Sequence, residues 1–113
     1  MQTIRIYFEY GTKAVGLSGW QKIWNNRLAN QLMKLCKEND MRQAIFFNVR
    51  NGYLDRQAIQ WGIGEIPSPK HPQCMEITDS KEKISHFVEQ LQPLLSATKI
   101  LAIEKQELIN YEL

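Results

Sequence analysis

The sequence predicts a ferredoxin-like α+β sandwich, in which two helices cover one face of a four-stranded antiparallel sheet. Segments with strand periodicity and segments with helix periodicity follow one another in the order β-α-β, long connection, β-α-β. Two β-α-β units of this kind fold into one sheet with both helices on the same face. The connection, residues 51–73, holds three of the four prolines and three of the six glycines, which indicates a long loop.

Length and composition indicate one domain, residues 1–113. The chain is 43% hydrophobic and 23% charged, as globular proteins ordinarily are, and 113 residues can bury a core without metals or disulfides. The N-terminal segment lacks an apolar run long enough for a signal peptide or a membrane span, and the chain has only two cysteines. We therefore expect a cytoplasmic protein without membrane insertion.

The charge of the chain is nearly balanced but unevenly placed. A net charge of +2 is too small for the concentrated basic surface of a nucleic-acid-binding protein, so no nucleic-acid partner is predicted. Residues 1–50 hold eight Lys or Arg and three Asp or Glu, whereas residues 51–113 hold six and nine. This asymmetry favours attraction between neighbouring subunits. A nucleic-acid-binding module that uses the basic first half of the chain is kept only as an alternative function.

The first half predicts a strand, a helix and a second strand. Apolar and polar side chains alternate over residues 3–10, as in a half-buried strand. A helix is predicted from Trp20 to Asn39, because apolar residues recur at threes and fours after a capping-box pattern at residues 18–21. Residues 41–50 predict a strand that is apolar on both faces, which indicates an interior strand or one in a subunit contact.

The second half repeats this order of elements. Residues 74–78 predict a short strand, and a second capping box precedes a helix over residues 80–95. Pro93 lacks an amide proton and is expected to kink or end this helix near Gln92. Residues 99–111 predict the last strand, which is apolar at first and more polar later.

The first part of the long connection is the predicted ligand site. Guanidinium groups bind carboxylate or phosphate, and a glycine lets backbone amides approach a ligand. The alternative is structural, because Asn-Gly is a strong hairpin signal, and residues 53–61 would then pair back on residues 44–50. Both interpretations hold together if the hairpin presents the arginines. The predicted ligand-binding residues are Arg50, Gly52, Arg56 and Gln57.

The second part of the connection is the predicted partner surface. Trp61 lies among glycines and polar residues, and an aromatic residue in such a loop either anchors a partner or ties the loop to the body of the protein. Both alternatives stay open. Lys70 and His71 follow in the same segment and are assigned to the same surface.

His71 and Cys74 could act as a chemical pair. Imidazole and thiolate both bind zinc, but a closed site needs four ligands and no second pair has suitable spacing, so no metal is predicted. Catalysis by the pair needs a third, orienting group, and no catalytic residue is predicted. The alternative function is a small ferredoxin-like enzyme, of isomerase or degradative type, with a pocket on the sheet that encloses one of these two side chains.

Four stretches of the chain carry a family resemblance. They are TIRIYFEY, VRNGYLDRQ, MEITDSKEKISHFVEQLQPLL and LAIEKQELINYEL. In this order and spacing they resemble the small PII-like signalling proteins, in particular a short branch of unknown function. The resemblance implies a homotrimer whose sheets face inward and whose intersubunit clefts hold a small effector, an adenine nucleotide in the PII proteins proper. It also implies that the loop of residues 51–73 docks onto a partner protein, commonly a membrane transporter or an enzyme.

The chain departs from the PII pattern at three places. Leu54 or Asp55 replaces the second glycine of the loop motif. Residues 96–99 replace the glycine-rich segment that binds phosphates, and Asn110 stands where relatives often have Arg. No cofactor is therefore assigned with certainty, and the effector is predicted to be an adenine nucleotide or another small anion.

Overall fold

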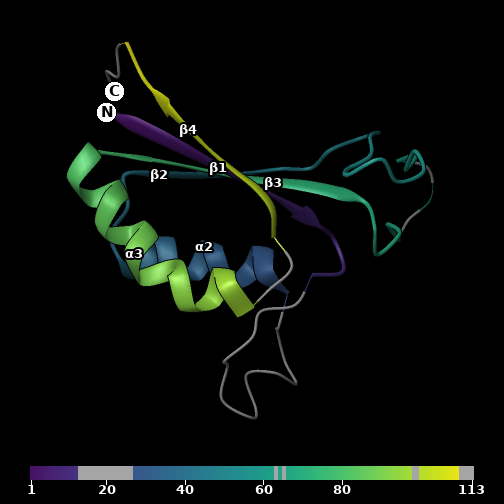
Figure 1. The fold of residues 1–113 in the computed structure, drawn as a ribbon, viewed down its shortest axis with the longest axis horizontal. Coiled ribbons are helices and arrows are strands. Elements are labelled where there is room, and N and C mark those ends of the chain that lie inside the picture. Colours follow the sequence, from purple (N-terminus) through teal and green to yellow (C-terminus); the bar gives the residue numbers. More distant parts are fainter. Residues whose placement is uncertain (13–26, 63, 65, 98–99, 110–113) are drawn as a thin grey trace.

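The computed structural model describes residues 1–12, 27–62, 64, 66–97 and 100–109. These residues form four antiparallel strands in the order β2-β3-β1-β4, with two helices on one face of the sheet (Figure 1). The ferredoxin-like α+β fold predicted from the sequence is confirmed. The elements are β1 (Gln2–Glu9), α2 (Leu28–Glu38), β2 (Gln43–Phe47), β3 (Pro72–Asp79), α3 (Lys81–Ala97) and β4 (Ile100–Glu107).

The strand β1 lies inside the sheet and supplies much of the core. It pairs antiparallel with β3 on one side and with β4 on the other. Ile4, Ile6 and Phe8 are at most 2% exposed, because alternate side chains of a strand point to the same face and this face meets the helices. Apolar side chains of both helices complete the core: Leu28, Leu32, Cys36, Ile84, Phe87 and Leu91.

The helix α2 begins later than the sequence predicts. Arg27 has an extended backbone (φ −70°, ψ 136°) and directly precedes the helix. The predicted continuous helix from Trp20 to Asn39 is therefore wrong at this residue, and its earlier part, with both tryptophans, lies outside the described residues. A tertiary contact accounts for the break. The Arg27 guanidinium lies 4.0 Å from the centre of the Tyr10 ring and donates a hydrogen bond to the Tyr10 carbonyl.

The end of α2 is a Schellman motif. The amide of Met41 donates to the carbonyl of Cys36 (3.0 Å), and the amide of Asp40 donates to that of Lys37 (3.1 Å). Asp40 has a left-handed backbone, with φ of 52°. The helix break predicted at Asn39 and Asp40 is confirmed.

The strand β2 lies at an edge of the sheet, and the prediction of an interior strand is wrong. Within the described part of the chain it pairs with β3 on one side. Ala44 and Phe46 pack against the core, whereas Ile45 and Phe47 point to the opposite face and are each 41% exposed. Both faces of β2 are therefore apolar for different reasons: one face packs against the core, and the other exposes its apolar side chains to solvent. A subunit contact through this second face remains a prediction.

The remaining elements differ from the prediction mainly at their ends. The second helix does not end near Gln92, because α3 runs through Pro93 to Ala97, and a kink at Pro93, the other expected outcome, remains a prediction. Proline removes one amide donor there, but the buried Leu91 holds this part of the helix against the core. β3 is longer than predicted and includes Pro72 and Gln73, whereas β4 is shorter.

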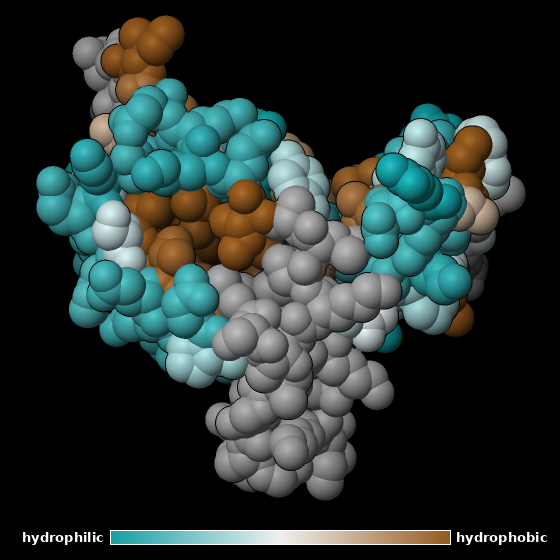
Figure 2. Space-filling model, viewed as in Figure 1, coloured by the Kyte–Doolittle hydropathy of each residue, from teal (hydrophilic) through white to brown (hydrophobic). Residues whose placement is uncertain are grey.

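The edge strand β4 extends beyond the cover of the helices. Ile103 pairs in register with the buried Ile6, yet it is 45% exposed. Figure 2 shows apolar surface between α3 and β4 on this side of the molecule.

Candidate functional site

The loop between β2 and β3, residues 48–71, begins with a short hairpin. Gly52 and Gln60 exchange two backbone hydrogen bonds, of 3.0 and 2.8 Å. The alternative in which residues 53–61 pair back on residues 44–50 is therefore wrong. The described part of β2 pairs with β3 instead, and the hairpin closes on itself farther along the chain.

The hairpin turn is formed by two residues with left-handed backbones. The Gln57 amide donates to the Leu54 carbonyl (3.0 Å), and the two residues between them, Asp55 and Arg56, have φ of 48° and 59°. Positive φ at both central positions is the requirement of a type I′ turn, which usually contains Asn-Gly. Each side chain costs about 1 kcal/mol in this conformation. The turn therefore holds Arg56 exposed at the tip of the hairpin.

Side chains anchor this hairpin to the rest of the protein. Gln57 Nε2 donates to Glu9 Oε1 at the end of β1 (3.0 Å). The Gly62 amide donates to Asn51 Oδ1 (2.8 Å), which joins the two arms of the loop. The arms are so close that a Cβ atom on Gly62 would lie 2.2 Å from the carbonyl oxygen of Arg50. Only glycine fits at this crossing.

His71 closes the loop at the start of β3. It is 5% exposed, and its Nε2 atom lies 2.6 Å from the carbonyl oxygen of Val49 on the opposite arm. A carbonyl can only accept, so Nε2 carries the proton and donates. The His71 carbonyl accepts from the Tyr10 amide (2.8 Å). The loop is thus tied at both ends to the sheet.

A cavity of about 260 Å³ lies between the two arms of the loop, and we call it the loop cavity. It brings together Arg50, predicted to bind a ligand, with Trp61 and His71, predicted to bind a partner. Arg50 and Trp61 are exposed at its opening. The other predicted residues do not line it: Gly52, Arg56, Gln57 and Lys70.

The loop also presents a set of apolar side chains to solvent, which we call the apolar loop surface. Its members are 49–84% exposed, although they lie on anchored backbone. Only Trp61 of this set is predicted from the sequence. The available signal for the others is that apolar residues recur without helix or strand periodicity inside a segment rich in Pro and Gly. The set consists of Tyr53, Ile59, Trp61 and Ile66.

The two cysteines are poor nucleophiles. Burial raises the pKa of the Cys36 thiol to about 12. The pKa of Cys74 is also raised, chiefly by burial and further by the charges of Glu76 and Glu104, although Arg5 acts in the opposite direction. Both thiols are therefore protonated at neutral pH. Within the described residues, no three His, Cys, Asp or Glu side chains gather as metal ligands would.

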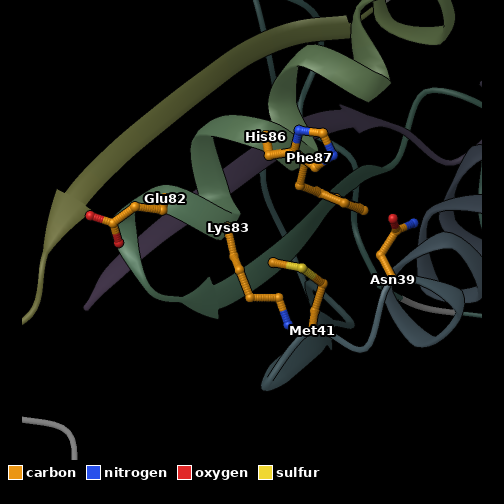
Figure 3. A pocket seen from close by; sticks show the side chains of 6 residues that line it. All are labelled: Asn39, Met41, Glu82, Lys83, His86 and Phe87. Carbon is orange, nitrogen blue, oxygen red and sulfur yellow. The ribbon is translucent and has the colours of Figure 1, made fainter.

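A second cavity, of about 240 Å³, lies between the end of α2 and the first turns of α3 (Figure 3). Its floor is apolar and contains Met41 and Phe87. Lys83 at its rim is already engaged, because its Nζ atom donates to the Asp40 carbonyl (2.6 Å) and lies 3.3 Å from the Asp79 carboxylate. Lys83 thereby holds the α2–β2 turn against α3, which is a structural role.

Comparison with known proteins gives the family of the chain. In the part of the chain that the structure describes, no helix is long and apolar enough to cross a membrane. No curated protein matches the sequence. A family model described as DUF190, Uncharacterized ACR, COG1993, matches residues 2–107, a span that runs from the start of β1 to the end of β4. The chain therefore belongs to the DUF190 family.

Proposed function

We propose that this protein is a PII-like regulatory protein, which binds a small effector and passes its state to a partner protein through the β2–β3 loop. The effector is a nucleotide or another small anion. The fold is compatible with this function, but a ferredoxin-like fold hosts many others. The observation that carries the proposal is the loop, which is anchored by its own hydrogen bonds and still presents the apolar loop surface to solvent.

The apolar loop surface is the proposed partner site. A surface on ordered backbone loses little conformational entropy on binding, and Trp and Tyr dominate the energy of many interfaces. Arg56 at the hairpin tip and Lys70 near the base of the loop are exposed cations. The partner therefore presents an apolar surface with acidic residues at its rim.

Site-specific photo-crosslinking tests the partner site. A photoreactive residue in place of Ile59 should capture one defined partner, and Trp61→Ala should abolish the capture. The matched control is a photoreactive residue in place of Glu89, which is exposed on α3. Capture of the same proteins from both positions would contradict the proposal.

We propose a homotrimer, in which the sheet face away from the helices is covered. This face carries Ile45 and Phe47 beside an ion pair of Arg5 and Glu76, whose atoms lie 2.9 Å apart. Exposed apolar side chains on an edge strand favour association. Light scattering should give about 40 kDa, three times the chain mass of 13.2 kDa, and Ile45→Lys should lower it. A monomer at every micromolar concentration would rule out the trimer.

Thermal-shift measurements test the effector. ATP, bicarbonate and small dicarboxylates are the first ligands to compare, and one of them should raise Tm by several degrees, because a ligand that binds only the folded state stabilises it. The Arg50→Gln, Arg56→Ala double variant should lose this increase. An equal increase in the double variant would show that the effector binds elsewhere.

A further inference from the structure

The loop cavity has the features of a small-molecule site within a single chain. Its lining combines polar residues, Asn48, Arg50 and His71, with the flat apolar residues Trp61 and Pro67. We propose that it binds a small, flat carboxylate, with the carboxylate on Arg50 and the flat part against Trp61. This inference rests on the proposed function, because it names the chemical class of the effector.

Arg50 supplies the charge for this ligand. Its guanidinium has no hydrogen-bond or ion-pair partner among the described residues, and Arg50 is an exposed residue of the cavity lining. A guanidinium is a planar fork that matches a carboxylate with two parallel hydrogen bonds. The side chain of Asn48 lines the same cavity and provides a neutral donor and acceptor.

Trp61 and Pro67 supply the apolar walls. Trp61 is 61% exposed, so much of its indole ring is free to contact a ligand. Pro67 and Val49 line the cavity as well. Aromatic rings favour stacked or edge-to-face contact with other flat groups. An aromatic or conjugated acid therefore fits these walls better than an extended chain does.

The size of the cavity limits the ligand. Its volume of about 260 Å³ is below the range of about 300–1,000 Å³ that is usual for drug-sized ligands. A whole nucleotide would extend out of a cavity of this size. A single-ring acid is of suitable size, and it would contact both arms of the loop at once.

Simultaneous contact with both arms connects the cavity to the partner surface. Arg50 lies on the outgoing arm, and Trp61 lies on the returning arm and also belongs to the apolar loop surface. A ligand held between them therefore fixes the position of a side chain that the partner contacts. Binding of the ligand and of the partner is then coupled through Trp61.

Nuclear magnetic resonance titration with benzoate tests the inference. Benzoate should shift the amide signals of residues 48–52, 60–62, 64 and 66, and benzamide, its neutral counterpart, should bind at least tenfold more weakly. Arg50→Gln should weaken benzoate binding at least tenfold, whereas Lys34→Gln, which removes an exposed cation on α2 outside the cavity, should leave it unchanged. Trp61→Leu should weaken it, and Trp61→Phe should restore much of it.

Equal binding of benzoate and benzamide, or equal effects of the Arg50 and Lys34 substitutions, would overturn the inference. So would shifts confined to residues outside the loop. If ATP stabilises the protein while benzoate does not bind, the flat-carboxylate assignment falls and the proposed function stands. If benzoate binds as expected but the loop captures no partner, the proposed function falls and the ligand site stands.

Discussion

Alanine at position 62 places a methyl group where the backbone of Arg50 already lies. The new Cβ atom would be 2.2 Å from the Arg50 carbonyl oxygen and 3.0 Å from its carbonyl carbon. Neither atom belongs to a flexible side chain, so the two arms of the loop must move apart by about 1 Å to reach ordinary contact distances of 3.3–3.6 Å. This movement breaks the hydrogen bond from the Gly62 amide to Asn51.

The magnitude follows from the strain and the lost hydrogen bond. Overpacking of this kind destabilises by about 1–3 kcal/mol, and the hydrogen bond contributes about 1 kcal/mol more. For a domain of this size, 1 kcal/mol corresponds to roughly 4 °C in Tm. The sum is about 2–4 kcal/mol, so we expect Gly62→Ala to lower Tm by about 8–16 °C if the loop unfolds only together with the domain. If the loop can open while the domain stays folded, we expect Tm to stay the same and amide exchange in residues 51–62 to become faster.

The matched control is the neighbouring glycine. Gly64 has a left-handed backbone, with φ of 99°, but a Cβ atom there would have no heavy atom within 4 Å. Gly64→Ala should therefore show a conformational cost of about 1 kcal/mol without the clash. Unchanged Tm together with unchanged amide exchange in Gly62→Ala would refute the close crossing of the two arms.

Three further predictions follow from the turn, from Asp79 and from the thiols. An Asp55→Asn, Arg56→Gly variant should raise Tm by roughly 4 °C for each kcal/mol of strain relieved, because Asn-Gly suits a type I′ turn. A lower Tm would show that the backbone of Asp55 and Arg56 is not strained. Burial raises the pKa of Asp79, but hydrogen bonds from the Ser80 and Arg42 amides and from Lys83 outweigh it, so this pKa lies below its ordinary value. Asp79 therefore stabilises the fold above about pH 4, and this contribution is lost as the pH falls through the lowered pKa. Denaturant titrations at pH 7 and pH 2 should show that Asp79→Asn destabilises mainly at pH 7, and equal effects at both would contradict the assignment. Ellman's reagent at pH 7.5 should modify neither thiol of the folded protein and both thiols after unfolding, because both are buried. Rapid reaction of one thiol in the folded protein would contradict this and favour the enzymatic alternative.

The fold could be predicted because the side chains that pack into the core recur in the sequence with the spacing of the strand or helix that carries them. Ile4, Ile6 and Phe8 alternate because one face of β1 meets the helices, and Ile84, Phe87 and Leu91 recur at helical spacing for the same reason. The start of α2 could not be predicted in this way. The break at Arg27 depends on a contact with Tyr10, which no local pattern contains.

The edge position of β2 and the shape of the loop also could not be predicted from local sequence patterns. Apolar residues on both faces of β2 suit an interior strand equally well, and only the strand order shows that Ile45 and Phe47 face solvent. Asn51 and Gly52 have the sequence of a tight turn, but the turn forms at Asp55 and Arg56 instead. There, the cross-loop contacts outweigh the intrinsic preference of the turn residues.

The convergence of Arg50, Trp61 and His71 is a tertiary property of the loop. Sequence spacing places Arg50 eleven residues before Trp61, and nothing local indicates that both line one cavity. The close crossing at Gly62 brings the two arms together. Glycines in a long loop mark where such crossings are feasible, but they do not identify which residues approach one another.

Amide hydrogen exchange of the wild-type loop tests the central claim, that residues 48–71 form an anchored surface rather than an unstructured connection. Measurable protection is expected at five amides, whose hydrogen bonds are 2.8–3.0 Å long. They are the amides of Gly52, Gln57, Gln60, Gly62 and His71. Protection at these amides, together with fast exchange at exposed neighbours such as Ile66, would support the account. Exchange of the whole loop at the rate of an unfolded peptide would contradict it.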